Sequence, residues 1–389
     1  HGHELADAVR DAQLHVADDG AGRERARVDA DKDECACMAV ALDLEDKGRQ
    51  RAVHVGVLGP GQVADDGVED GLDANVFERR AAEHGRDRLR QRDSPERRVN
   101  VVGRHVVADG EEELGKVVVG VGGGEFGIRG FIAAYDAETG EEAWRFYTIP
   151  GPGEPGHDTW QGDDWEHGGA PVWITGSYDP ELNLTYWGVG NPGPDWNAGQ
   201  RPGDNLYSDA VVALDADTGE LVWHFQFTPN DGYDYDSVQV PVLVDMDWDG
   251  RPRKLMLWAN RNGFYYTLDR ETGEFLLGKP FAKQTWAEGL DTNGRPIRRP
   301  GMLPSAEGTL VSPMAGGATN WWSPAYSPRT ELFYVNAYDG EQEYFIRDQE
   351  YVEGEQYTGG GGQNVLPVDN YTSAIRAIDP RTGDRRWEF

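Results

Sequence analysis

The sequence is poor in cysteine and in basic residues, and it has no long apolar run. Only two of its 389 residues are Cys, and 37 Lys and Arg stand against 69 Asp and Glu, a net charge of -32. This acidity argues against nucleic acid as a partner, because phosphate binding needs a basic face. Without an apolar run of about 18 residues, the chain has no transmembrane helix. No signal peptide is visible, and because the chain starts at His1 rather than Met we expect a fragment.

The first 114 residues differ in composition from the rest. Every Trp, Tyr, Thr and Ile lies after position 127, whereas six of the nine His lie before it. Such a segment has little aromatic or β-branched mass to bury beyond Val. We hypothesise that residues 1 to about 114 are GC-rich DNA read in the wrong frame or strand; the alternative is a disordered extension. Both cysteines, Cys35 and Cys37, fall here, and a single Cys-x-Cys is a weak indication of a metal or redox site.

One pattern recurs between residues 115 and 389. An apolar pair is followed by Asp, two residues, Thr-Gly and, after a short gap, usually Trp. The Asp and Thr-Gly predict a tight turn between two strands, and the Trp would start the next strand and pack on a neighbouring unit. The repeat therefore predicts an all-β propeller or solenoid whose uneven spacing reflects long insertions. The copies centre on Asp136, Asp215, Asp269 and Asp379, with Trp144, Trp223, Leu277 and Trp387 at the Trp position.

Hard oxygen donors occur at three places in this repeat region. Asp234 and Asp236 alternate with Tyr233 and Tyr235, and two carboxylates two positions apart on an extended chain point to the same side. One could act as a base while the other binds a cation. Glu125 follows three glycines, and Asn191 opens the turn Asn-Pro-Gly-Pro. Each could equally be an ordinary surface or turn residue.

Several motifs together resemble the pyrroloquinoline quinone (PQQ)-dependent methanol/ethanol dehydrogenases, from about residue 115 to 389. They are the repeat with its Trp, Gly-Gly-Glu-Phe-Gly-Ile-Arg-Gly, Gly-Asn-Pro-Gly-Pro-Asp-Trp-Asn and Asn-Arg-Asn-Gly. The resemblance implies part of an eight-bladed β-propeller with PQQ and a metal ion near its axis. Glu125, Asn191 and Asp234 would hold the metal, and Asp234 would be the catalytic base. Asp236 stands where lanthanide-using members carry an extra Asp, so a lanthanide ion (La³⁺ or Ce³⁺) is preferred to Ca²⁺.

The resemblance also assigns the cofactor contacts. Trp173 would stack on the quinone, and Arg261 would hydrogen-bond its reactive carbonyl and so take part in catalysis. Asn320 and the backbone at Gly123 and Gly124 would contact the cofactor rim. By default Trp173 would pack between blades and Arg261 would form a salt bridge. The chain departs from the family pattern at Pro171, where relatives often carry Thr or Ser, and it lacks the adjacent cysteine pair.

The implied activity is oxidation of a primary alcohol to an aldehyde, with electrons passed to a cytochrome c in the periplasm. The family resemblance also allows a homodimer. Two other hypotheses stay open. Related repeats occur in non-catalytic propeller scaffolds, although a scaffold needs no set of hard metal ligands. The early and final blades are missing from this sequence, so the chain could also be an inactive fragment of the dehydrogenase.

Overall fold

The computed structural model describes residues 14–18, 24–28, 101–107, 115–364 and 371–389. The chain divides into two units, His1–Glu96 and Arg97–Phe389. In the first, β1 (Leu14–Asp18) pairs antiparallel with β2 (Glu24–Val28). Cys35 and Cys37 lie outside the described residues, and the hypothesis on the origin of residues 1–114 stays a prediction.

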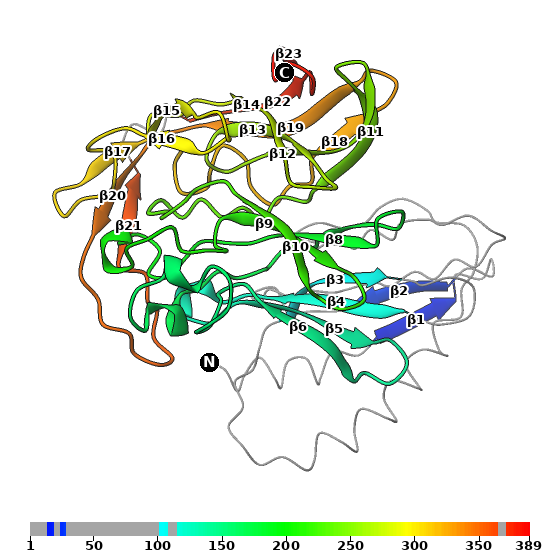
Figure 1. Cartoon of the computed structure of the whole chain (residues 1–389), viewed down its shortest axis with the longest axis horizontal. Coiled ribbons are helices and arrows are strands. Elements are labelled where there is room, and N and C mark those ends of the chain that lie inside the picture. The colour runs from blue at the N-terminus through cyan, green and yellow to red at the C-terminus, as the bar shows by residue number, and fades with distance from the viewer. Residues whose placement is uncertain (1–13, 19–23, 29–100, 108–114, 365–370) are drawn as a thin grey trace. The chain divides into compact units, whose positions relative to one another are not determined.

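The second unit contains four antiparallel sheets of four strands each (Figure 1). Each sheet is built from strands that follow one another along the chain, apart from one insertion in the last sheet. The first sheet includes β3, which precedes the composition boundary near residue 114 and pairs with β4. The sheets are β3 (Val101–Val107), β4 (Lys116–Val121), β5 (Phe131–Asp136) and β6 (Glu142–Tyr147); β7 (Ser177–Asp179), β8 (Leu184–Gly188), β9 (Ala210–Asp215) and β10 (Leu221–Gln226); β11 (Val242–Trp248), β12 (Arg251–Ala259), β13 (Phe264–Asp269) and β14 (Phe275–Pro280); and β18 (Ala325–Ser327), β19 (Leu332–Asp339), β22 (Thr372–Ile378) and β23 (Arg385–Glu388).

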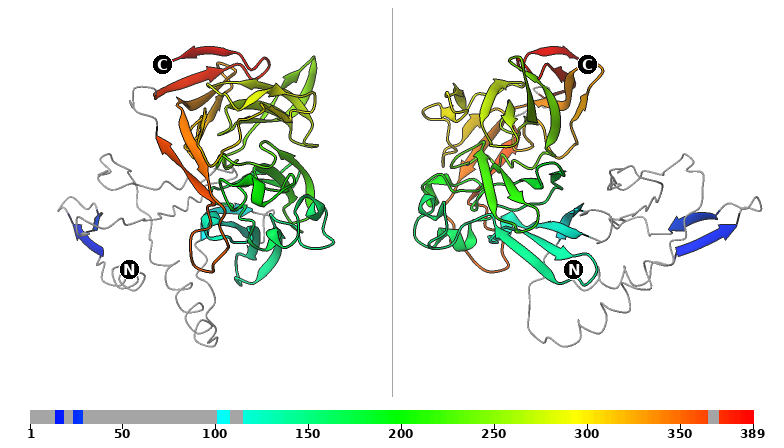
Figure 2. Two further views of the ribbon diagram at one scale, coloured as in Figure 1. Left: turned by 90° about the vertical axis from the view of Figure 1, so that its left-hand side faces the viewer. Right: turned by 45° about the vertical axis from the view of Figure 1, so that its right-hand side comes forward.

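Two smaller sheets are inserted between these blades, and Figure 2 shows them from two further sides. One pairs β15 (Ala287–Leu290) with β16 (Pro296–Arg298), and the other has the order β17 (Thr309–Val311), β20 (Gln342–Ile346), β21 (Gly360–Asn364). The helical residues in the described ranges form four short 3-10 turns: η1 (Gly124–Phe126), η2 (His157–Thr159), η3 (Asp164–His167) and η4 (Ala198–Gln200). No helix in these ranges has the length and apolar character needed to cross a membrane. The predicted all-β propeller architecture is therefore confirmed.

The sequence repeat forms the turn predicted for it. Asp136, Asp215 and Asp269 each accept a hydrogen bond from the backbone N–H of the Thr three residues later, at 2.7, 2.9 and 3.2 Å. The Asp side chain thereby closes the bend, and Gly follows with a positive φ. All three turns connect the last two strands of a blade.

The repeat tryptophans join neighbouring sheets. Trp144 Nε1 donates to the carbonyl oxygen of Ala216 in the next turn at 3.0 Å, and Trp223 Nε1 donates to that of Arg270 at 3.1 Å. Leu277 takes the same place in the third copy, facing Gly383. Trp387 is 44% exposed and packs on Tyr334. Each docked Trp therefore buries its ring on the following turn, as the repeat predicts.

We expect Gly219→Ala to destabilise the fold more than Gly140→Ala. Both glycines occupy the same repeat position with φ of 72° and 70°. A Cβ at Gly219 would lie 2.5 Å from Trp144, whereas nothing lies within 4 Å of one at Gly140. Left-handed strain costs about 1–2 kcal/mol at either site, and the steric clash adds about 1–3 kcal/mol at Gly219. Urea unfolding of both variants measures the difference; equal losses would contradict the docking of Trp144.

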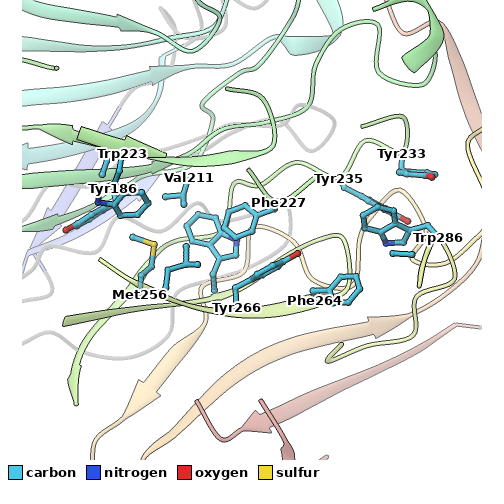
Figure 3. Packing of buried hydrophobic residues seen from close by; sticks show 14 of the residues in the cluster. Tyr186, Val211, Trp223, Phe227, Tyr233, Tyr235, Met256, Phe264, Tyr266 and Trp286 are labelled. Atoms are coloured by element: carbon cyan, nitrogen blue, oxygen red, sulfur yellow. The ribbon is translucent and has the colours of Figure 1, made fainter. Parts of the chain in front are cut away.

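A cluster of buried aromatic side chains fills the space between the second and third sheets (Figure 3). Tyr186 and Trp223 lie at one end of it, and Tyr233 and Tyr235 lie beside Trp286 at the other. Tyr233 and Tyr235 are fully buried, and their hydroxyls donate to the carbonyl oxygens of Met302 and Pro313. The core thus anchors the two tyrosines that flank Asp234.

Candidate functional site

The loop that carries Asp234 and Asp236 is held by a third carboxylate, Asp231. Its two oxygens accept the backbone N–H groups of Tyr233 and Tyr235 at 3.1 and 3.0 Å. These bonds curl the chain, and Asp234 has a left-handed φ of 62°. The expectation of an extended chain was therefore wrong at Asp234. Asp234 and Asp236 nevertheless face one common partner.

That partner is Arg261, whose guanidinium lies between the two carboxylates. Its Nη1 donates to Asp236 Oδ2 at 2.5 Å, and its Nη2 donates to Asp234 Oδ2 at 3.4 Å and to the carbonyl oxygen of Ala315. Gly317 packs against the stem of Arg261, where a Cβ would lie 2.6 Å from its Cγ. Burial alone would lower the pKa of Arg261, but Asp236 and Asp234 raise it, so the group stays cationic.

Asn191 joins this cluster through its backbone. Its N–H donates to Asp236 Oδ1 at 2.8 Å, and its side-chain Nδ2 donates to Asp195 Oδ1 at 2.9 Å. The amide oxygen is thereby turned toward η1, where it lies 3.5 Å from the position of a Cβ on Gly124. Asn191 is 4% exposed. The structure thus places Asn191 beside Asp236, and the metal-ligand roles of both residues stay predictions.

Glu125 lies in η1 between two glycines of positive φ, Gly123 at 107° and Gly127 at 57°. Its side chain is exposed, and its backbone oxygen accepts the N–H of Tyr357. Burial raises the pKa of the Asp195 carboxyl, and the negative charge of Glu125 raises this pKa further. The Glu125 turn and the Asn191 loop are therefore electrostatic neighbours.

Pro171 occupies the space between these two loops. A Cβ on Gly124 would lie 2.9 Å from its ring, and a Cβ on Gly190 would lie 2.8 Å from the same ring and 2.3 Å from Asp236 Oδ1. Only glycine allows such close approach from both sides. The residue that departs from the family pattern thus fits this site sterically.

The remaining predicted cofactor residues lie on two segments around this cluster. Asn320 belongs to the loop that follows Gly317, and Ala318 N–H donates to the carbonyl oxygen of Arg261 at 2.9 Å. The Asn320 side chain forms hydrogen bonds within its own loop: its Nδ2 donates to Gly316 O at 2.9 Å, and its Oδ1 accepts the Trp321 N–H at 2.8 Å. Trp173 is partly exposed and follows Val172, which bonds to the end of β4. The quinone-stacking role of Trp173 stays a prediction.

The donor set fits a hard cation, although it is not a closed cage. Carboxylate and amide oxygens suit Ca²⁺ and the trivalent lanthanides. Within the described ranges, however, no three His, Cys, Asp or Glu side chains lie close enough to form a site by themselves. Both oxygens of Asp236 are already engaged, by Asn191 N–H and by Arg261. Glu125, Asn191 and Asp234 thus offer the freer oxygens, and Asp236 could bind a metal only by giving up a present partner.

Asp234 has the electrostatics of a base. Burial raises its pKa well above the usual value, Arg261 opposes this, and Asp236 raises it further. A carboxylate with a raised pKa holds a proton more firmly, which favours accepting one from a bound hydroxyl group. The role of Asp234 as the catalytic base stays a prediction.

Sequence reasoning missed the buried polar residues beneath the site. Arg201 is fully buried and donates to the carbonyl oxygens of Pro194, Asp195 and Asp231, so it joins the Asn191 loop to the Asp234 loop. Asp209 is also fully buried; neither carboxylate oxygen has a hydrogen-bond partner among the described residues, and burial raises its pKa. Neither residue stands in a motif, so no local signal could have found it.

These observations define a β-propeller whose loops bring carboxylate and amide groups together around a buried arginine. Residues 114–279 match the family model described as "PQQ: Glucose/ethanol/alcohol dehydrogenase, beta-propeller domain". This part of the chain is therefore a PQQ-dehydrogenase β-propeller, and its relatives are quinoprotein alcohol dehydrogenases.

Individual relatives support this family assignment. Quinoprotein alcohol dehydrogenase PedH of Pseudomonas putida is 42% identical over 299 residues, which cover 70% of this chain and 50% of PedH. The quinohemoprotein alcohol dehydrogenase structure from Comamonas testosteroni has a TM-score of 0.70 and 34% identity, covering 76% of this chain and 47% of that one. A europium-containing methanol dehydrogenase has a TM-score of 0.67 and 35% identity, covering 74% and 53%. The chain thus spans about half the length of the relatives it matches.

Proposed function

We propose that this chain belongs to a PQQ- and metal-dependent dehydrogenase that oxidises a primary alcohol to an aldehyde. The observation that carries the proposal is the buried Arg261, held between Asp234 and Asp236 with Asn191 bonded to the same Asp236. A non-catalytic scaffold has no use for such a cluster, because burying charges costs more than packing apolar side chains.

The residues of the site divide the chemistry among them. When bound, PQQ supplies the oxidising quinone and the metal a Lewis acid. Glu125, Asn191 and Asp234 would hold the metal. Asp234 takes the hydroxyl proton of the alcohol on a carboxylate oxygen, and Arg261 orients that carboxylate and stabilises its charge. Gly123, Gly124, Trp173 and Asn320 would line the cofactor.

We propose a lanthanide as the preferred ion and Ca²⁺ as the alternative. Asp236 adds a third carboxylate to Glu125 and Asp234, and a trivalent cation gains more than a divalent one from each added negative charge. Asp236 accepts hydrogen bonds from Arg261 and from the Asn191 N–H. The proposal therefore requires Asp236 to give up one of these hydrogen bonds when it binds the metal. The europium-containing relative is consistent with this preference.

A cytochrome c in the periplasm is the proposed electron acceptor. The net charge of -32 suits a basic partner, because opposite charges steer association. The acidic turn η3, with Asp164 and Glu166, adds to this field near the Glu125 loop.

Reconstitution of the full chain with PQQ tests the proposed function. We expect quinone absorbance to stay with the protein, and a primary alcohol to reduce an artificial dye or cytochrome c when La³⁺ is present. Ca²⁺ in place of La³⁺ should give a slower rate. If PQQ binds but no alcohol is oxidised with either ion, the catalytic proposal fails for this chain; if no PQQ binds, the chain is an inactive part of the dehydrogenase.

A further inference from the structure

The segment between β20 and β21, residues 347–359, runs from the inserted sheet to the loops that carry two proposed metal ligands; we call it the strap (Figure 1). It has no regular secondary structure, and most of its side chains are exposed. Its exposed residues include Val352, which is 49% exposed. The contacts that hold the strap come from its two ends and from Tyr351.

The ends of the strap bind the Asn191 loop. Trp196 N–H donates to the carbonyl oxygen of Thr358 at 3.0 Å. Gln200 and Gln349 form a reciprocal pair: Gln200 Nε2 donates to Gln349 O at 2.9 Å, and Gln349 N–H donates to Gln200 Oε1 at 3.1 Å. Gly359 adds a close packing contact, because a Cβ there would lie 2.8 Å from Pro194. The strap is thus hydrogen-bonded to Trp196 and Gln200, which follow Asn191 in the chain.

Tyr357 and Tyr351 of the strap contact the Glu125 turn. Tyr357 N–H donates to the backbone oxygen of Glu125 at 2.6 Å. The Tyr351 ring stacks on His167 with centroids 3.6 Å apart and planes 13° apart. On its edge the same ring meets Gly127, where a Cβ would lie 2.7 Å away. Tyr351 is therefore wedged between η3 and the glycine that ends η1.

This arrangement matters because the Glu125 turn is held, besides the strap, by two backbone hydrogen bonds of its own and by the packing of Gly124 on Pro171. Two left-handed glycines flank a three-residue turn, and glycine gives the backbone wide conformational freedom. The Glu125 side chain is exposed and has no hydrogen bond within the part of the chain that the structure describes, so its position depends on the backbone of the turn. Removal of a group that orients a metal ligand commonly lowers the metal affinity about 10–100-fold.

We infer that the strap, through Tyr351, sets the distance between Glu125 and Asn191 and thereby the metal affinity and the ionic size that the site accepts. Tyr351 is a positioning residue in this inference, which rests on the metal site of the proposed function. A large ion such as La³⁺ and a small one such as Lu³⁺ need different separations of the same two ligands. A site with a fixed distance between the two ligands discriminates between large and small ions. A site in which this distance varies discriminates less.

Terbium titration of the full chain tests this inference, because bound Tb³⁺ is sensitised by nearby Trp and Tyr. We expect Tyr351→Ala to weaken Tb³⁺ binding about tenfold or more and to reduce the La³⁺-to-Lu³⁺ affinity ratio in competition. Tyr351→Phe keeps the ring and should stay within about twofold of wild type. Val352→Ala is the control on the same strap, because it removes an apolar side chain that is 49% exposed.

Hydrogen exchange of the metal-free proteins separates a local effect from general unfolding. Tyr351→Ala should speed exchange at residues 123–127 and 191–197 while the sheets keep their protection. Equal Tb³⁺ affinity and size discrimination in Tyr351→Ala and Tyr351→Phe would overturn the inference alone. Wild-type protein that binds no Tb³⁺ would overturn the proposed metal site and the inference with it.

Discussion

Asp234→Asn is expected to lower alcohol-dependent dye reduction by about 10²–10⁴-fold, because the variant cannot accept the proton of the alcohol. Asn has nearly the same volume as Asp and tolerates the left-handed backbone observed at this position, where φ is 62°. Arg261 keeps its closer contact with Asp236. The fold should therefore survive, and the loss should appear in kcat of the reconstituted protein.

Asp249→Asn is the matched control for this experiment. Asp249 has a similar left-handed φ of 52°, and the same charge is removed, but the residue is exposed on the turn between β11 and β12. We expect unchanged turnover. If Asp234→Asn retained full turnover while binding PQQ and metal, Asp234 would not be the base.

Asp236→Ala is expected to abolish lanthanide-dependent activity and to destabilise the fold. Asp236 is 5% exposed and accepts bonds from Arg261 and from Asn191 N–H. Its removal takes away the shorter carboxylate contact of the buried Arg261 and leaves the 3.4 Å contact with Asp234. Breaking a buried ion pair costs about 3–5 kcal/mol of folding free energy. The free energy of unfolding without metal measures this structural part.

The metal preference is measured separately, with Asp236→Asn. Asn still offers an oxygen to the Asn191 N–H but carries no charge, so the loop should keep more of its shape than in Asp236→Ala. We expect the ratio of La³⁺-dependent to Ca²⁺-dependent turnover to fall relative to wild type, because the lost charge matters more to the trivalent ion. An unchanged ratio would contradict the role of Asp236 in selecting a lanthanide.

The blades could be predicted from the sequence because their signals are local. Asp136 closes its own turn through Thr139, and Trp144 docks on the next copy of the same turn. Each contact repeats at a fixed offset from one motif, so periodicity is enough to find it. The inserted sheets escaped prediction, since β17 pairs with β20 across a long stretch of intervening chain.

The sequence identified several residues of the site but not the conformation of the loops that carry them. The motifs identified Asp236, Arg261 and Asn191, which the structure brings into contact. The bend at Asp234 was missed, because it depends on Asp231, whose carboxylate acts on N–H groups two and four residues away. Arg201 was missed as well, since its hydrogen bonds reach carbonyl groups on separate loops. The Arg201 contacts follow from tertiary packing and leave no spacing rule in the sequence.

Anomalous diffraction from crystals of the full chain grown with PQQ and a lanthanide tests the central claim most directly. Data collected at the absorption edge of the ion locate it independently of any assumed ligand set. The account predicts one strong peak bounded by oxygens of Glu125, Asn191, Asp234 and Asp236, with Arg261 displaced from Asp236 Oδ2 toward the quinone. A lanthanide bound elsewhere on the acidic surface, with Arg261 still paired to Asp236, would contradict it.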